Sequence, residues 1–283
     1  MATYATTVDA GLPGRGAGLE ANLRGVYIIW YREVLRYWRD RVRIVASLGQ
    51  PALFLIIFGG GLSASLGAGF TQQLGDVSYV RFVYPGIISM AVLFTSIFSA
   101  ISIVWDREFG FLRELLVAPV SRAAVVMGKA LGGSTIAMFQ GALLLVLAPI
   151  LGVDLDPLLV LELLALMFLM AFAITSMGIL VASRLQTMES FQMIINFFVM
   201  PMFFLSGAFF PLRGLPGWMS VLTRLDPVAY GVDPMRRALL GSTLAPGIRI
   251  GSYHLGTGVD VAIMAVFAAA MLSLAMRAFE SQE

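Results

Sequence analysis

Residues 83–104 have the sequence VYPGIISMAVLFTSIFSAISIV, and none of these 22 residues is charged. A helix rises about 1.5 Å per residue, so this run is long enough to cross a bilayer core about 30 Å thick. Helices are the natural spanning form because lipid offers no hydrogen-bond partner to unpaired amides. The run therefore predicts a transmembrane helix.

Five other stretches share this apolar character, and the centre of each carries no charged residue. The six predicted spans cover residues 44–66, 83–105, 124–150, 158–182, 190–210 and 257–276. Hydrophobic residues make up 59% of the 283-residue chain and charged residues 13%, with a mean hydropathy of +0.87. We therefore expect an all-α polytopic membrane protein, with one transmembrane domain over residues 24–283 after a disordered cytoplasmic tail at 1–23.

The positive charges are distributed unevenly between the two predicted sides. Thirteen of the 19 Lys and Arg residues fall on the side of the termini, and six fall on the other side. The positive-inside rule therefore predicts that both termini are cytoplasmic. The chain has no cysteine, which excludes disulfides and thiol chemistry.

Three absences narrow the function. Lys129 is the only lysine and is followed by Ala130, so the chain has no Gly-Lys-Ser/Thr segment to hold nucleotide phosphates. His254 is the only histidine and no cysteine accompanies it, so we expect neither a metal centre nor a catalytic site. The span centres lack the acidic or basic groups that ion-coupled carriers usually keep, and Glu162 is expected to snorkel to the interface. The energy source for transport is therefore expected in another chain.

Residues 24–43 (RGVYIIWYREVLRYWRDRVR) form a predicted amphipathic helix before the first span. At 100° per residue the arginines fall in one narrow arc and the aromatic and aliphatic residues lie opposite. This pattern favours an interfacial elbow helix along the inner headgroup layer, with a soluble coil as the alternative. The residues assigned to this interface are Trp30, Arg32, Arg36, Trp38, Arg39 and Arg43.

Residues 106–122 (DREFGFLRELLVAPVSR) form the longest internal cytoplasmic connection. Its apolar residues follow helical spacing over 108–117, and Ser121 is positioned to cap the third span. Two interpretations fit: docking against a soluble partner, or packing on the membrane surface or on the elbow. The candidate docking residues are Glu108, Phe111, Leu112, Arg113, Glu114, Leu115 and Leu116.

Two further features concern the membrane interior and the outer side. Gly128 and Gly132 form a small-xxx-small pattern that permits close helix approach, although such patterns are common in apolar sequence. The outer segment 211–256 contains two predicted short amphipathic helices, at 215–225 and 230–240, which indicate a re-entrant or surface-lying cap. Candidate lining residues of a transport path, each with a structural role as the alternative, are Ser96, Ser99, Gln192, Asn196 and Phe203.

Three stretches carry a family resemblance: RELLVAP at 113–119, LSGAFFPL at 205–212 and LPGWMSVLTRLDPVAYGVDPMR at 215–236. In this order, the chain from about residue 24 onward resembles the ABC type-2 exporter permeases, in the branch of drug-resistance and nodulation lipo-oligosaccharide exporters. The resemblance implies a second permease copy and two cytoplasmic P-loop ATPase subunits that bind ATP and Mg. It also implies a coupling helix at 108–117, outer helices that close the exit, and the inner membrane of a prokaryote.

The resulting hypothesis is an exporter permease that is not itself an enzyme and uses ATP hydrolysed by a separate subunit. A secondary transporter or channel without an ATPase is the leading alternative, and an intramembrane hydrolase or a scaffold are further ones. An amphipathic drug, a lipid or a lipid-linked saccharide would each suit the apolar interior. Neither the cargo nor the choice between homodimer and heterodimer follows from the sequence.

Overall fold

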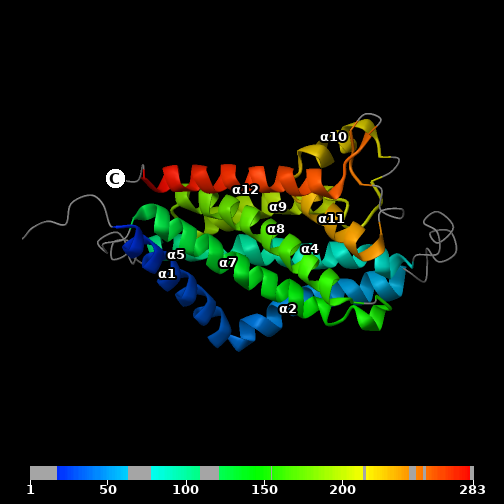
Figure 1. Ribbon diagram of the computed structural model, residues 1–283, viewed down its shortest axis with the longest axis horizontal. Helices are drawn as coiled ribbons and strands as arrows, with labels where there is room; N and C mark the ends of the chain where they lie inside the picture. The colour runs from blue at the N-terminus through cyan, green and yellow to red at the C-terminus, as the bar shows by residue number, and fades with distance from the viewer. Residues whose placement is uncertain are drawn as a thin grey trace, which may run out of the picture.

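The computed structural model describes residues 18–62, 78–108, 121–153, 155–212, 215–241, 247–250 and 253–280. Figure 1 shows an elongated bundle in which the longest helices run along the long axis. The beginning of the first helix and the end of the last helix lie at one end of this bundle, and two short helices lie at the other. Six of the predicted docking residues, at positions 111–116, fall outside the described residues.

Helices account for nearly all of the described structure. They are α1 (Leu19–Arg39), α2 (Arg41–Ile56), the π-helical η1 (Ile57–Leu62), α4 (Tyr79–Ser99), α5 (Ile101–Glu108), α7 (Arg122–Leu145), the 3-10 turn η2 (Pro149–Leu151), α8 (Pro157–Arg184), α9 (Met188–Leu205), α10 (Gly217–Leu225), α11 (Ala229–Leu240) and α12 (Thr257–Glu280). The strands β1 (Arg249–Ile250) and β2 (Tyr253–His254) pair as one small antiparallel hairpin.

Four helices within the described ranges are long and apolar enough to span a membrane: α4 with α5, α8, α9 and α12. The all-α polytopic membrane fold is thereby confirmed. The first predicted span corresponds to a shorter apolar helix, residues Ile44–Ile56, followed by η1. The third corresponds to α7, which has 24 residues but includes Lys129, Gln140 and several Gly and Ser residues that lower its hydropathy.

The core lies around α4, which packs against α7, α8 and α11. Its side chains from Phe82 to Leu93 are all buried. The outer helices bury only a stripe: in α9 this stripe is Phe191, Ile195, Val199 and Phe203, spaced four residues apart on one helix face. Most of the remaining residues of α9 and α12 are exposed or half-buried and many of them are apolar, which suits contact with lipid or another membrane chain.

Helix α1 packs along α7 through close backbone approach. A Cβ atom added to Gly128 would lie 2.8 Å from Ile29 Cβ, and one added to Gly132 would lie 2.8 Å from Glu33 Cβ. The small-xxx-small pattern therefore serves the α1–α7 contact. At Asp40 the chain leaves α1 and turns into α2, which Figure 1 shows as a sharp bend.

Candidate functional site

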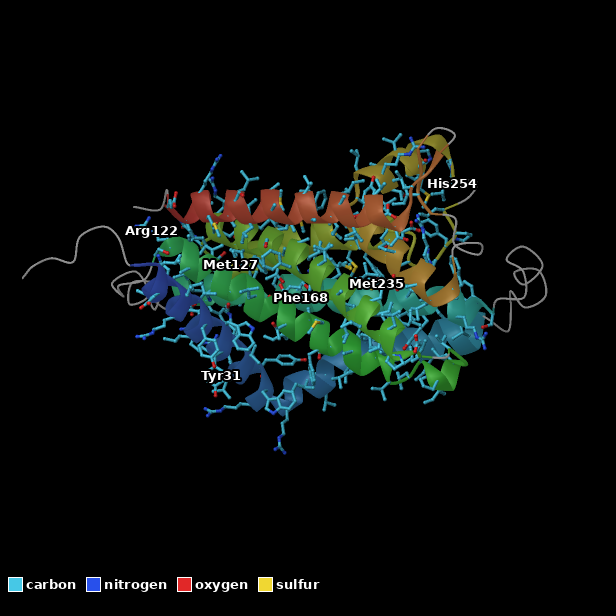
Figure 2. The ribbon with its side chains drawn as sticks, viewed as in Figure 1. Tyr31, Arg122, Met127, Phe168, Met235 and His254 are labelled. Atoms are coloured by element: carbon cyan, nitrogen blue, oxygen red, sulfur yellow. The ribbon has the colours of Figure 1, made fainter. Side chains whose placement is uncertain are left out.

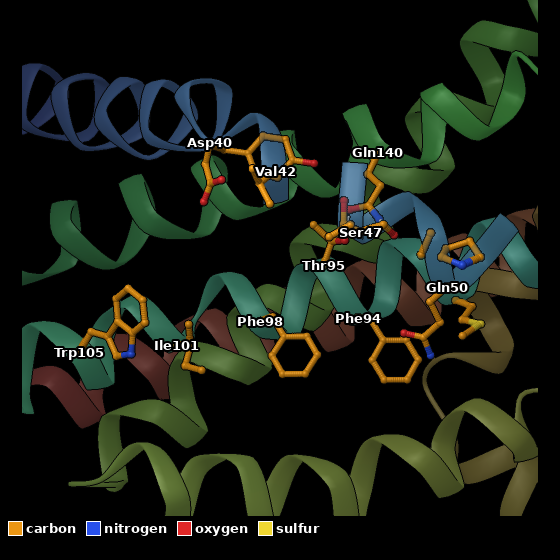
Figure 3. Close-up of a pocket in the computed structure, with 15 residues that line it drawn as sticks. Asp40, Val42, Ser47, Gln50, Phe94, Thr95, Phe98, Ile101, Trp105 and Gln140 are labelled. Carbon is orange, nitrogen blue, oxygen red and sulfur yellow. Dashed lines mark hydrogen bonds between the residues drawn. The ribbon is translucent and has the colours of Figure 1, made fainter. Parts of the chain in front are cut away.

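A cavity of about 500 Å³ lies between the α1–α2 bend, the α4–α5 helices and α7. Figure 3 shows Phe94, Phe98, Ile101 and Trp105 along one wall, with Asp40 and Val42 across from them. Much of the wall is aromatic or aliphatic, and Asp40 is the charged residue among the described lining residues. Such a chamber suits an uncharged or amphipathic molecule of moderate size.

A chain of hydrogen bonds crosses this wall from α4 through α7 to α2. Thr95 Oγ1 donates to Gln140 Oε1, and Gln140 Nε2 donates to the Ser47 carbonyl at 2.7 Å. Proline has no N–H, so Pro51 leaves the carbonyl four residues earlier, that of Ser47, without its helical donor. Gln140 supplies the missing donor, which makes the proline in α2 compatible with an apolar environment.

The predicted lining residues do not gather in this cavity. Ser96 is buried between α4 and α8, where Thr175 Oγ1 donates to its carbonyl at 3.4 Å, and Phe203 is buried with its ring 6.1 Å from that of Phe94. Ser99 borders a smaller cavity of about 40 Å³ beside Lys129. Gln192 and Asn196 are exposed on α9. Their contact with cargo stays a prediction.

Sequence reasoning missed the aromatic residues Phe94, Phe98 and Trp105 that line the cavity, because apolar rings within a span have no distinctive pattern. It also missed Gln140. The only glutamine of the third predicted span was a usable signal, since a buried amide in a membrane helix needs a partner.

The elbow residues divide between the α7 contact and the exposed side of α1. Trp30 Nε1 donates to Thr135 Oγ1 at 3.0 Å, and the Trp38 ring lies 5.2 Å from that of Phe139. Arg36 and Arg39 are exposed, Arg32 is half-buried, and the side chain of Arg43 lies outside the described part. Figure 2 shows Tyr31 pointing away from the bundle. Placement of this face in the headgroup layer stays a prediction.

The end of the bundle where α1 begins and α12 ends is named the inner end after its predicted orientation, and the opposite end is named the outer end. At the inner end, α5 is fixed to its neighbours just before the predicted coupling helix. Arg107 donates to the carbonyls of Leu185 at 2.7 Å and Ser183 at 3.0 Å, at the end of α8. Glu108 ends α5 and is exposed. The Ser121 hydroxyl accepts the Ala124 N–H at 3.2 Å and caps α7, as predicted.

Lys129 of α7 lies at the centre of a buried ionic network. Its ammonium group contacts Asp106 Oδ2 at 2.8 Å, Ser102 Oγ at 3.0 Å and Glu33 Oε1 at 3.5 Å. Arg32 Nη2 lies 3.3 Å from the same Glu33 oxygen. Sequence reasoning used Lys129 only to exclude a P-loop and gave Glu33 no role. Hereafter the Lys129 network means Glu33, Ser102, Asp106 and Lys129.

At the outer end, α11 is buried while α10 is exposed. Trp218, Val221 and Leu225 of α10 are exposed, as suits a helix at the membrane surface. In α11 every side chain from Ala229 to Arg237 is buried. The burial of α11 favours the re-entrant alternative and the exposure of α10 favours the surface-lying one, while the position of both helices relative to the membrane stays a prediction.

Two arginines of α11 hold the outer end together. Arg236 Nη2 donates to the carbonyls of Gly207 at 2.7 Å and Ala208 at 3.1 Å, and its guanidinium lies 4.3 Å from the centre of the Phe82 ring. Arg237 pairs with Asp233 and, at 3.2 Å, with Asp260 of α12. Hereafter the outer cluster means Asp233, Arg236, Arg237 and Asp260.

The LSGAFFPL stretch forms the turn that Arg236 contacts. Gly207 has φ = +75°, a conformation that glycine adopts without strain. Thr223 donates to the Leu205 carbonyl at 2.9 Å, so α10 also caps the end of α9. A Cβ atom on Gly86 would lie 2.4 Å from the Ala208 oxygen, so α4 needs glycine at this contact.

Asp226, between α10 and α11, is buried with one oxygen accepting the Val228 N–H at 2.9 Å. Burial raises the pKa of its carboxyl to about 8, although the hydrogen bond from Val228 opposes the shift.

A bundle of apolar helices with a cavity beside α1 is the architecture of a polytopic membrane protein. Residues 24–240 match the protein family described as ABC-2 type transporter. The chain is 30% identical to the putative transport permease ycf38 of Cyanophora paradoxa, over 76% of this chain and 73% of that protein. It is 28% identical to nodulation protein J of Rhizobium meliloti, over 86% and 89% of the two chains. It is also 27% identical to the inner membrane transport permease YadH of Escherichia coli, over 77% and 84%.

The chain therefore belongs to the ABC-2 type transporter family and is a transport permease. Permeases of this family generally work with an ATPase partner.

Proposed function

We propose that this chain is the membrane subunit of an ATP-driven exporter. It moves an amphipathic drug-like molecule, a lipid or a lipid-linked saccharide out of the cytoplasm or the inner leaflet. The observation that supports this cargo class is the cavity of about 500 Å³, whose wall is aromatic and aliphatic with a few neutral polar groups.

In this proposal ATP and Mg are bound by a separate P-loop subunit, present in two copies, and a second permease copy completes the transporter. Family membership and the missing Gly-Lys-Ser/Thr segment support a borrowed ATPase. The exposed apolar face of α9, with Gln192 and Asn196 on it, supports a further membrane partner. ATP can drive the cycle only if the ATPase binds the inward-open and closed arrangements with different affinities.

The proposed location is the cytoplasmic membrane of a prokaryote, with both termini in the cytoplasm. The excess of Lys and Arg on the side of the termini supports this orientation. In Figure 1 the start of α1 and the end of α12 lie at the same end of the bundle. Figure 2 places Arg122 at that end and His254 at the other.

The test is transport by the purified complex in proteoliposomes. The chain copurified with its native partners is expected to carry a stoichiometric P-loop subunit and to accumulate cargo only with ATP. Gradient-driven accumulation by the chain alone, under a pH or sodium difference, would support a secondary transporter and end the proposal. The double substitution Leu112→Asp and Leu115→Asp should abolish cargo-stimulated ATPase activity while leaving membrane insertion intact.

The cavity is tested separately with two phenylalanines of different position. Phe94→Ala enlarges the cavity and removes a ring from its wall, so the apparent KM for cargo should change. Phe197→Ala removes a ring of the same size from the exposed face of α9 and is the matched control for cargo binding in the cavity. An unchanged KM in the Phe94 variant would place the cargo path outside this cavity.

A further inference from the structure

The Lys129 network joins three elements at one point near the inner end of the bundle. Glu33 comes from α1, Ser102 and Asp106 come from α5, and Lys129 comes from α7. Lys129 is 4% exposed, and the three groups that it contacts are all buried. These partners are far apart in sequence, with Glu33 and Lys129 separated by 96 residues. The network therefore connects helices that no short loop holds together.

The charges in this network balance only when all the helices are in place. Lys129 carries one positive charge against the two carboxylates, and the half-exposed Arg32 supplies a second positive charge at Glu33. A buried carboxylate without its cation is strongly unfavourable. Movement of α1 or α5 away from α7 would leave such a group behind, so the three helices are held as one unit.

Packing alone does not require these charges. Helix α1 already approaches α7 closely at Gly128 and Gly132. Replacement of a buried ion pair by apolar groups of similar size is often neutral or favourable for stability. The charges lie beside α5, so a role other than holding the helices together can be tested there.

Helix α5 is suited to transmit movement because it is a separate segment. The α4 helix ends at Ser99, and Ala100 interrupts the helix before α5 begins at Ile101. Ser99 and Ser102 bond to carbonyls three residues earlier, at 2.7 and 3.1 Å, a pattern that bends helices. On its other side α5 is tied to the end of α8 through Arg107. The connection at 109–120 follows α5, which ends at Glu108, and precedes α7, which begins at Arg122, so its displacement acts on both helices.

We propose that the Lys129 network makes α1, α5 and α7 respond together to a displacement of this connection, so that Lys129 is a positioning residue in energy coupling. The elbow helix and the third span then follow the cytoplasmic connection as one body. Because α1, α5 and α7 all border the cavity, their common movement changes its shape. This inference rests on the proposed function as an ATP-driven exporter.

The first experiment follows the distance between α1 and α5 in the assembled complex. The chain has no cysteine, so Ile28→Cys on α1 and Trp105→Cys on α5, both exposed, can each carry a spin label, and the measurement is made without cargo because Trp105 borders the cavity. ATP binding should leave this label separation unchanged, while a label pair from Ile28→Cys to the exposed Val266→Cys on α12 should change its separation. An ATP-dependent change between α1 and α5 would overturn the proposal.

The second experiment removes every formal charge of the network while keeping its size. The triple variant Glu33→Gln, Asp106→Asn and Lys129→Met should hydrolyse ATP but transport about tenfold less cargo per ATP. In that variant the α1–α5 separation should broaden on ATP binding. The control Glu189→Gln with Arg184→Gln removes charges of the same kinds from exposed positions at the same end of the bundle.

The outcomes separate the two proposals. Wild-type transport per ATP in the triple variant overturns the role of the network alone. If the wild-type complex shows no ATP-driven transport, the proposed function fails and this inference fails with it. If the triple variant does not assemble, the α1–α5 label separation in the complex with an intact network still tests the proposal.

Discussion

Buried charges hold both ends of this bundle, but at one end Lys129 binds side chains and at the other end Arg236 binds backbone carbonyls. At the inner end, Lys129 binds side chains from α1 and α5, so the contact joins separate helices to one another. At the outer end, Arg236 binds the backbone carbonyls of Gly207 and Ala208, so the contact fixes the path of the chain itself. The inner end is thus built as a joint between helices, and the outer end as a fixed closure.

The centres of the predicted spans carry no charge, yet buried charges occur at both ends of the bundle. Each set lies where a short element, α5 or α11, has little apolar surface of its own to bury. Charge-assisted hydrogen bonds, which are stronger than neutral ones, hold such elements in place of packing area.

The largest expected effect is that of Lys129→Met alone. It leaves the buried Asp106 without its cation and Glu33 with only the half-exposed Arg32, so we expect it to destabilise the protein by about 3–5 kcal/mol. The measurement is thermal unfolding in detergent, with the exposed Arg184→Gln as the control. The neutral triple variant should recover most of this loss. Equal instability of the single and triple variants would mean that the charges are not the cause.

Arg236→Met tests the outer closure. Two backbone carbonyls lose a charged donor in a buried site, and we expect a loss of about 3 kcal/mol. Limited proteolysis should show early cleavage in the 205–228 segment, with α1 still protected. Cleavage that begins in α1 instead would contradict the assignment of Arg236 to the outer turn.

A smaller effect is expected where α1 meets α7. Gly132→Ala places a methyl group 2.8 Å from Glu33 Cβ, so α1 must shift, at a cost of about 1–3 kcal/mol. Gly49→Ala in α2 has open space around its Cβ and should be neutral or slightly stabilising. If both variants unfold at the same temperature, the close approach of α1 does not contribute to stability.

The last expected effect is the pH dependence of stability at Asp226. Burial raises the pKa of this carboxyl in the folded protein from 3.8 to about 8, so the folded state binds more protons than the unfolded state between these values. Stability is therefore highest below the unfolded pKa and decreases as pH rises toward the folded pKa, by at most about 1.4 kcal/mol per pH unit.

The Tm in detergent, measured between about pH 5 and pH 8, should decrease less in Asp226→Asn than in the wild type. Asp156→Asn changes an exposed carboxyl at the start of α8 and should leave the slope as it is. An unaltered slope in the Asp226 variant would assign the pH dependence to another group.

The helical, membrane-spanning character could be predicted from the sequence because it depends on local composition. The partners of each helix could not be predicted in this way. Gly128 and Gly132 showed that some helix comes close to α7, but only the structure shows that it is α1. The same holds for Lys129, whose acidic partners lie 23 and 96 residues away. Asp106, placed in the cytoplasmic connection by composition, belongs to a buried ion pair.

The hydrogen bond from Gln140 to the Ser47 carbonyl has a consequence for the width of the cavity between α2, α4 and α7. Pro51 allows α2 to bend, but exposing the Ser47 carbonyl to lipid without a hydrogen-bond donor would be strongly unfavourable. A movement of α2 must therefore move α7 as well, or stay within the length of the Gln140 side chain. Pro51 therefore provides a hinge in α2, and the hydrogen bond from Gln140 limits how far α2 can move about it.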